Sequence, residues 1–132
     1  MPLSYLLALF IGLPIIELAL LIEVHGRVGF APTLLLVLLT GVAGAALVRR
    51  QGLAILLQIQ REVSVGNIPA PQMLDGVMIL VAGALLVTPG LITDSVGFML
   101  LIPYIRTRIR SWLKRRLEER IRSGYIQVHV RR

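Results

Sequence analysis

The chain has 132 residues, of which 56% are hydrophobic and 16% are charged, and its formal net charge is +7. A soluble domain has about 25% charged residues, and a chain this short could not bury its long apolar runs, so an ordinary soluble domain is excluded. The chain has no cysteine, which excludes disulfides and thiolate metal sites.

Three apolar runs predict membrane segments. Residues 3–22 contain one acid, Glu17, residues 28–48 contain no charge, and residues 76–102 contain only Asp94. About 20 helical residues cross a hydrocarbon core of about 30 Å. The sequence therefore predicts an all-α membrane protein, with a membrane domain over residues 1–105.

The first two runs predict transmembrane helices. Pro14 lies at mid-depth in the first and should disturb its helix, because proline removes a backbone hydrogen bond. Glu17 falls within that disturbed turn and could bond a carbonyl that Pro14 leaves free. In the second, small residues such as Gly41 and Gly44 allow close helix approach, either within the monomer or in a dimer. After this run, residues 51–66 predict a short helix along the membrane interface.

The third apolar run is broken by Pro89 and Gly90. Each half is too short to cross the core, so a re-entrant or short-helix hairpin is favoured over one broken span. Thr93 and Asp94 would then begin the return helix, where their oxygens could cap free N–H groups. Basic residues mark cytoplasmic loops, and they follow both the second run and the third. A hairpin therefore predicts a multi-pass membrane protein with both termini in the cytoplasm.

Residues 106–132 form a basic tail, predicted to be cytoplasmic. Its apolar residues recur at helical spacing with arginine and lysine between them, which is typical of an amphipathic helix on a membrane surface. Anionic lipid is the favoured partner; nucleic acid is disfavoured, and a protein partner or a second copy of the chain remains an alternative. Residues 126–130 alternate like a strand. The residues predicted to face lipid are Arg106, Arg108, Arg110, Trp112, Lys114, Arg115 and Arg116.

Several motifs resemble those of a known family. They are PIIEL at 14–18, LVRRQG at 47–52, IPAPQMLDG at 68–76, VAGALLVTPGLITDSVG at 81–97 and LLIP at 100–103. Over residues 10–105 the chain resembles the FxsA family of small bacterial inner-membrane proteins. The resemblance implies a location and a fold pattern, and it implies no enzyme activity and no cofactor.

Two functional hypotheses follow. No motif of a hydrolase, metalloprotease or nucleotide-binding enzyme is present, so the first is a non-enzymatic membrane protein that acts by interaction with lipid or protein. The second is a small oligomeric proton- or ion-coupled conduit, because acids at membrane depth are functional candidates. Glu17 and Asp94 would be its titratable groups. Caps and close packing around these acids would favour the first hypothesis, and a wet polar cavity would favour the second.

Overall fold

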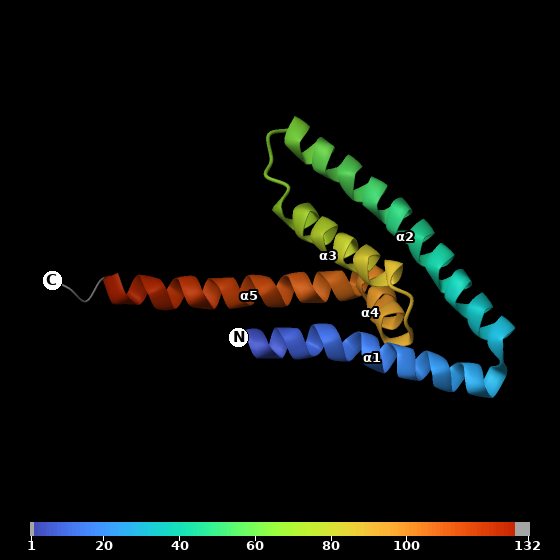
Figure 1. Cartoon of the computed structure of the whole chain (residues 1–132). Helices are drawn as coiled ribbons and strands as arrows, with labels where there is room; N and C mark the ends of the chain where they lie inside the picture. The colour runs from blue at the N-terminus through green and yellow to red at the C-terminus, as the bar shows by residue number, and fades with distance from the viewer. Residues whose placement is uncertain (1, 129–132) are drawn as a thin grey trace.

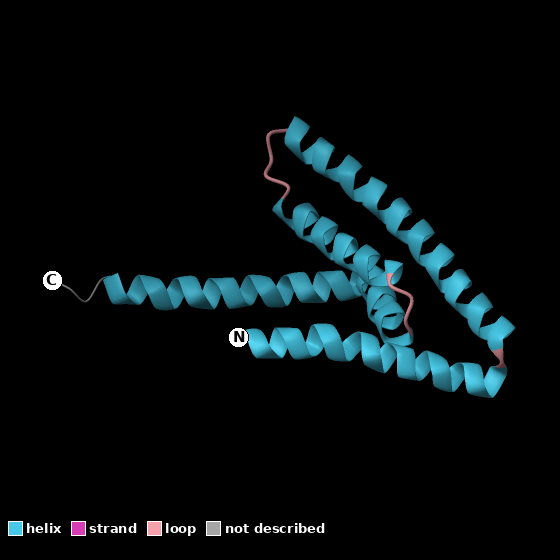
Figure 2. Ribbon diagram, viewed as in Figure 1, coloured by secondary structure: helices cyan, strands magenta, loops and turns pink. Residues whose placement is uncertain are grey.

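A computed structural model describes residues 2–128 of the chain, with side chains up to Arg122. This part folds into helices joined by short loops (Figures 1 and 2). Three of the helices are long and apolar enough to cross a membrane, and a fourth, α4, is apolar but shorter. The helices are α1 (Leu3–Val28), α2 (Phe30–Ser64), α3 (Ala70–Val87), α4 (Leu91–Leu101) and α5 (Pro103–Val128).

The predicted break in the third apolar run is confirmed. α3 ends at Val87 and α4 begins at Leu91, and the two helices pack as an antiparallel hairpin. Pro89 lacks an N–H donor and disfavours helical backbone at the residue before it; Thr88 is accordingly extended, with ψ 108°, and α3 ends there. However, α3 begins at Ala70 and has 18 residues. The expectation that neither half could cross a membrane is therefore wrong for α3 by length and composition.

The predicted interfacial helix over residues 51–66 is wrong as a separate element. The second span and this segment form one helix of 35 residues, α2, which is about 52 Å long at 1.5 Å per residue. The only weak helix former at the expected junction is Gly52, and one glycine costs only about 1 kcal/mol in a helix interior. Buried Ile55 lies against Gly76 of α3, so packing on the hairpin stabilises this part of α2. The helix ends at Ser64, and Gly66, two residues further on, has a φ of 80°, which favours glycine.

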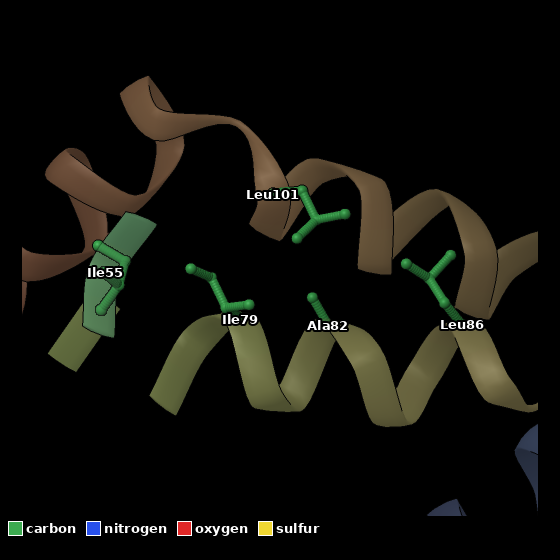
Figure 3. Close-up of a cluster of buried hydrophobic side chains, with 5 residues drawn as sticks. All are labelled: Ile55, Ile79, Ala82, Leu86 and Leu101. Carbon is green, nitrogen blue, oxygen red and sulfur yellow. The ribbon is translucent and has the colours of Figure 1, made fainter. Parts of the chain in front are cut away.

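The buried core lies where α2, α3 and α4 meet. Gly97 of α4 approaches α3 so closely that a Cβ there would lie 2.8 Å from the Leu86 side chain and 3.2 Å from the Ala82 carbonyl oxygen. Small residues at 97 and 82 thus let α4 and α3 pack in close contact. Figure 3 shows the apolar side chains of this core: Ile55, Ile79, Ala82, Leu86 and Leu101.

The small residues of α2 differ in their surroundings, which predicts different effects of the same substitution. A Cβ on Gly44 would lie 2.9 Å from a Leu86 methyl group, whereas a Cβ on Gly41 would meet nothing within 4 Å. Gly44→Leu should therefore lower the free energy of unfolding by about 1–3 kcal/mol, the usual cost of overpacking, and Gly41→Leu should have little effect. Thermal melting of both variants in detergent checks this, and equal melting temperatures would contradict the packing described here.

The predicted strand near the C-terminus is wrong for the residues that the structure describes. α5 continues through Ser123 and Gly124 to Val128. The remaining part of the strand prediction, residues 129–130, lies outside the described residues.

Candidate functional site: the polar groups at both ends of α4

The carboxylate of Glu17 binds the start of α4. Its Oε2 accepts a hydrogen bond from the backbone N–H of Ile92 at 3.1 Å, and its Oε1 accepts one from the backbone N–H of Thr93. The first N–H groups of a helix have no partner within the helix, and the positive end of the helix dipole attracts an anion. Glu17 is only 5% exposed. A residue of α1 therefore supplies the N-terminal cap of a helix that is more than 70 residues away in the sequence.

Gly90 makes this contact sterically feasible. Its backbone is extended, with φ −167°, so any residue could adopt its conformation. A Cβ at this position, however, would lie within 2.6 Å of the carboxyl carbon and both carboxyl oxygens of Glu17. Gly90 is also the N-cap residue of α4 and has no side chain with which to cap it. Gly90 thus cannot cap α4 with a side chain of its own, but it leaves space for the Glu17 carboxylate of α1.

The structure corrects the predicted roles of the three polar residues in this region. Asp94 does not cap α4: its side chain is 8% exposed, and its Oδ1 is buried without a hydrogen-bond partner among the described residues. The Thr93 hydroxyl donates to the Thr88 carbonyl oxygen at 3.3 Å, across the turn between α3 and α4. It therefore does not cap an N–H group. Glu17 accepts from N–H groups of α4 rather than donating to a carbonyl near Pro14. The predicted caps failed because Glu17, from a distant helix, already occupies the N–H groups.

A basic residue binds the opposite end of α4. Arg106 is only 6% exposed, and its Nη1 donates to the Leu101 carbonyl oxygen at 2.9 Å and to Oε1 of Gln51 on α2. The last carbonyls of a helix lack partners within it, and cations are stabilising at that end. The prediction that Arg106 lies on the lipid surface is therefore corrected. Since α5 begins two residues after α4 ends, Arg106 in its first turn stays within reach of the last carbonyls of α4.

The other basic residues of α5 divide into two groups. Arg110 is partly buried and forms an ion pair with Asp75 of α3, with Nη1 3.0 Å from Oδ2. Beyond it, the guanidinium of Arg116 lies 5.2 Å from the centre of the Trp112 ring. The residues of the predicted lipid surface that the structure leaves exposed are Arg108, Trp112, Lys114, Arg115 and Arg116.

Two of these contacts were not apparent from the sequence. Gln51 lies in the segment assigned to the membrane interface, and Asp75 lies just before the predicted hairpin, so neither was a candidate. A local signal exists only for Arg106: it stands three residues after Pro103, at the point where a new helix must begin. No group of three or more potential metal ligands occurs among the described residues.

Comparison with known proteins agrees with this architecture. A family model described as "FxsA cytoplasmic membrane protein" matches residues 8–116. The chain belongs to the FxsA family. The match includes Glu17, the hairpin and the first half of α5, and thus extends further into the basic helix than the motifs indicated. FxsA proteins are proteins of the cytoplasmic membrane, and the three membrane-capable helices described above fit that location.

Named relatives occur in three bacteria. The chain is 36% identical to UPF0716 protein YtzA of Bacillus subtilis over 110 residues, which are 83% of this chain and 84% of the relative. It is 40% identical to UPF0716 protein FxsA of Serratia marcescens over 101 residues, 76% and 72% of the two chains. It is 37% identical to UPF0716 protein FxsA of Escherichia coli over 94 residues, 71% and 60% of the two chains. No solved structure matches.

Proposed function

We propose that this FxsA protein is a non-enzymatic, multi-pass protein of the inner membrane that uses α5 to bind anionic lipid at the cytoplasmic surface. One observation carries the proposal: beyond its first two turns, α5 exposes a basic face and apolar side chains together. Trp112 is 58% exposed and Leu117 is 54% exposed, between exposed arginine and lysine residues. A helix of this kind beside a membrane segment is typical of binding at the lipid interface.

The charge of α5 supports an anionic partner. The helix has eight lysine and arginine residues and two glutamates. Each basic residue near an anionic membrane surface contributes about 1 kcal/mol of attraction. Arginine side chains stacked on Tyr104 and Trp112 keep this charge next to the aromatic rings, and such rings favour the membrane interface.

The proposal requires the C-terminus in the cytoplasm, and the predicted topology places both termini there. Arg49, Arg50 and the basic residues of α5 follow apolar segments, and such residues favour the cytoplasmic side. Reporter fusions before Met1 and after Arg132 should both give a cytoplasmic signal in intact cells. A periplasmic signal from the C-terminal fusion would separate α5 from the cytoplasmic surface and would refute the proposal.

The lipid contact can be followed through Trp112, which is the one tryptophan of the chain. In nanodiscs that contain phosphatidylglycerol, brominated acyl chains should quench Trp112 fluorescence, and in nanodiscs of phosphatidylcholine alone they should quench it less. Leu117→Ser keeps the charge of α5 and should reduce quenching, because the apolar face also contributes to binding. Equal quenching in the two lipids would show that α5 does not select anionic lipid.

The alternative function, a small oligomeric proton- or ion-coupled conduit, now depends on Asp94. Both oxygens of Glu17 are engaged in capping α4, a role that uses them as fixed hydrogen-bond acceptors. Asp94 is buried and has no comparable structural role in the described part of the chain. Proton flux and thermal stability of the Asp94→Asn variant separate the two functions.

A further inference from the structure

The region between α3 and α5 contains an open apolar groove. The two helices diverge from the neighbourhood of α4 (Figure 1), and the groove between them has a volume of about 750 Å³. Pockets that hold small molecules have volumes of about 300–1,000 Å³ and are lined mostly by apolar side chains. The apolar residues that line this groove are Ala70, Pro71, Leu74, Leu113, Leu117 and Ile121.

Basic side chains line one part of this α3–α5 groove. Arg110 and Lys114 are four residues apart on α5, so they share one face of the helix. Arg110 uses Nη1 for its bond to Asp75, and a guanidinium group has further N–H donors. Ser111 adds a hydroxyl, while the one acid of the lining, Glu118, lies a further turn along α5. The groove thus places donors for a phosphate at one end and apolar contacts along its length.

We propose that the α3–α5 groove binds one anionic phospholipid molecule, with its phosphate at Arg110 and Lys114 and an acyl chain along Leu74, Leu113 and Leu117. Charge complementarity supports this occupant, because α5 carries six more basic than acidic residues and a second copy of so basic a helix would be repelled. The site rests on the proposed function in one respect: α5 must lie at the lipid interface. The groove would hold one lipid molecule at a defined position, in addition to the general attraction of α5 to an anionic membrane surface.

Native mass spectrometry of the full chain in detergent tests the site, with phosphatidylglycerol and phosphatidylcholine as probes. The wild type should retain one phosphatidylglycerol molecule in preference to phosphatidylcholine. Lys114→Gln should weaken this retention about fivefold, the effect of one basic charge beside an anionic lipid. Arg115→Gln removes the same charge from the same helix outside the groove lining, and it should reduce retention of the single bound lipid less than Lys114→Gln does.

A second variant tests the apolar part of the groove. Ala70 is exposed at the start of α3, so Ala70→Phe should fold normally while filling the groove, and the bound lipid should be lost. Equal retention by Ala70→Phe and wild type, or equal losses in Lys114→Gln and Arg115→Gln, would overturn the site. A dimer that disappears in Ala70→Phe would show that a second copy occupies the groove, which also overturns it. Trp112 quenching in nanodiscs reports separately on the general surface contact, so failure of the site and failure of the proposed function are distinguishable.

Discussion

Glu17→Gln is expected to lower the free energy of unfolding by about 1–3 kcal/mol, because an unsatisfied buried polar group costs that much. Glutamine keeps one acceptor oxygen, but its amide NH₂ would face a backbone N–H of Ile92 or Thr93, and two donors cannot bond to each other. Glu17→Ala should cost more, since both N–H groups then lose their acceptor and no water is present at membrane depth to replace it. Thermal melting in detergent and protein abundance in membranes measure both effects.

Asp94→Asn is the matched control for Glu17→Gln. It makes the same chemical change in a second buried acid of the same region, but the Asp94 Oδ1 has no hydrogen-bond partner in the described structure. Its melting temperature should therefore fall less than that of Glu17→Gln, and a larger fall would contradict the assignment of Glu17 as the cap. Proton flux in proteoliposomes that is present in wild type and lost in Asp94→Asn, with stability unchanged, would instead support the conduit.

Gly90 should be energetically coupled to Glu17. Gly90→Ala alone should destabilise the protein, because its new Cβ would collide with the carboxyl group. In a Glu17→Ala background that collision is removed, so the double variant should be more stable than the sum of the two single effects indicates. Residues in contact typically show interaction energies of about 0.5–3 kcal/mol. Strict additivity would mean that the two residues do not touch.

Arg106→Ala is expected to destabilise the protein by at least about 1.5–3 kcal/mol, the contribution of a hydrogen bond to a charged group. The change leaves the Leu101 carbonyl and the Gln51 amide without their donor and opens a cavity in the bundle. Arg106→Lys should recover part of the loss, because an ammonium group keeps the charge but lacks the fork of N–H donors that a guanidinium has. Melting of the purified chain measures both variants.

Arg115→Ala provides the comparison for Arg106→Ala. Both residues lie on α5, but Arg115 is exposed, and surface substitutions usually change stability by no more than about 0.5 kcal/mol. If the two alanine variants melt alike, Arg106 does not stabilise α4. If Arg106→Ala alone melts early, the short helix depends on a charged partner at its C-terminal end as well as at its N-terminal end.

The sequence by itself determined the features that depend on local chemistry. Long apolar runs identify a membrane protein whatever their packing, because length and hydropathy alone decide whether a segment can cross a bilayer. Pro89 followed by Gly90 likewise predicts the end of α3, since proline lacks an N–H donor and disfavours helical backbone at the residue before it. Pro14 alone does not end a helix, and it lies inside α1. The basic character of α5 can be read from residue types alone. The separation of α2 into two helices was wrong because Gly52 weakens a helix only slightly, and the contact of Ile55 with Gly76 on the hairpin stabilises the continuous form.

Only the tertiary structure decided which groups satisfy the ends of α4. Thr93 and Asp94 were reasonable local caps, but several residues can satisfy the same backbone N–H groups, and the packing of α1 against Gly90 selects Glu17. In the same way Arg106 resembles its basic neighbours in the sequence, and only its contacts with the end of α4 and with Gln51 of α2 place it in the interior. Hydrogen-bond partners separated by more than 50 residues leave no periodic pattern in the chain, so the physical reason for both roles lies in the three-dimensional packing of the helices.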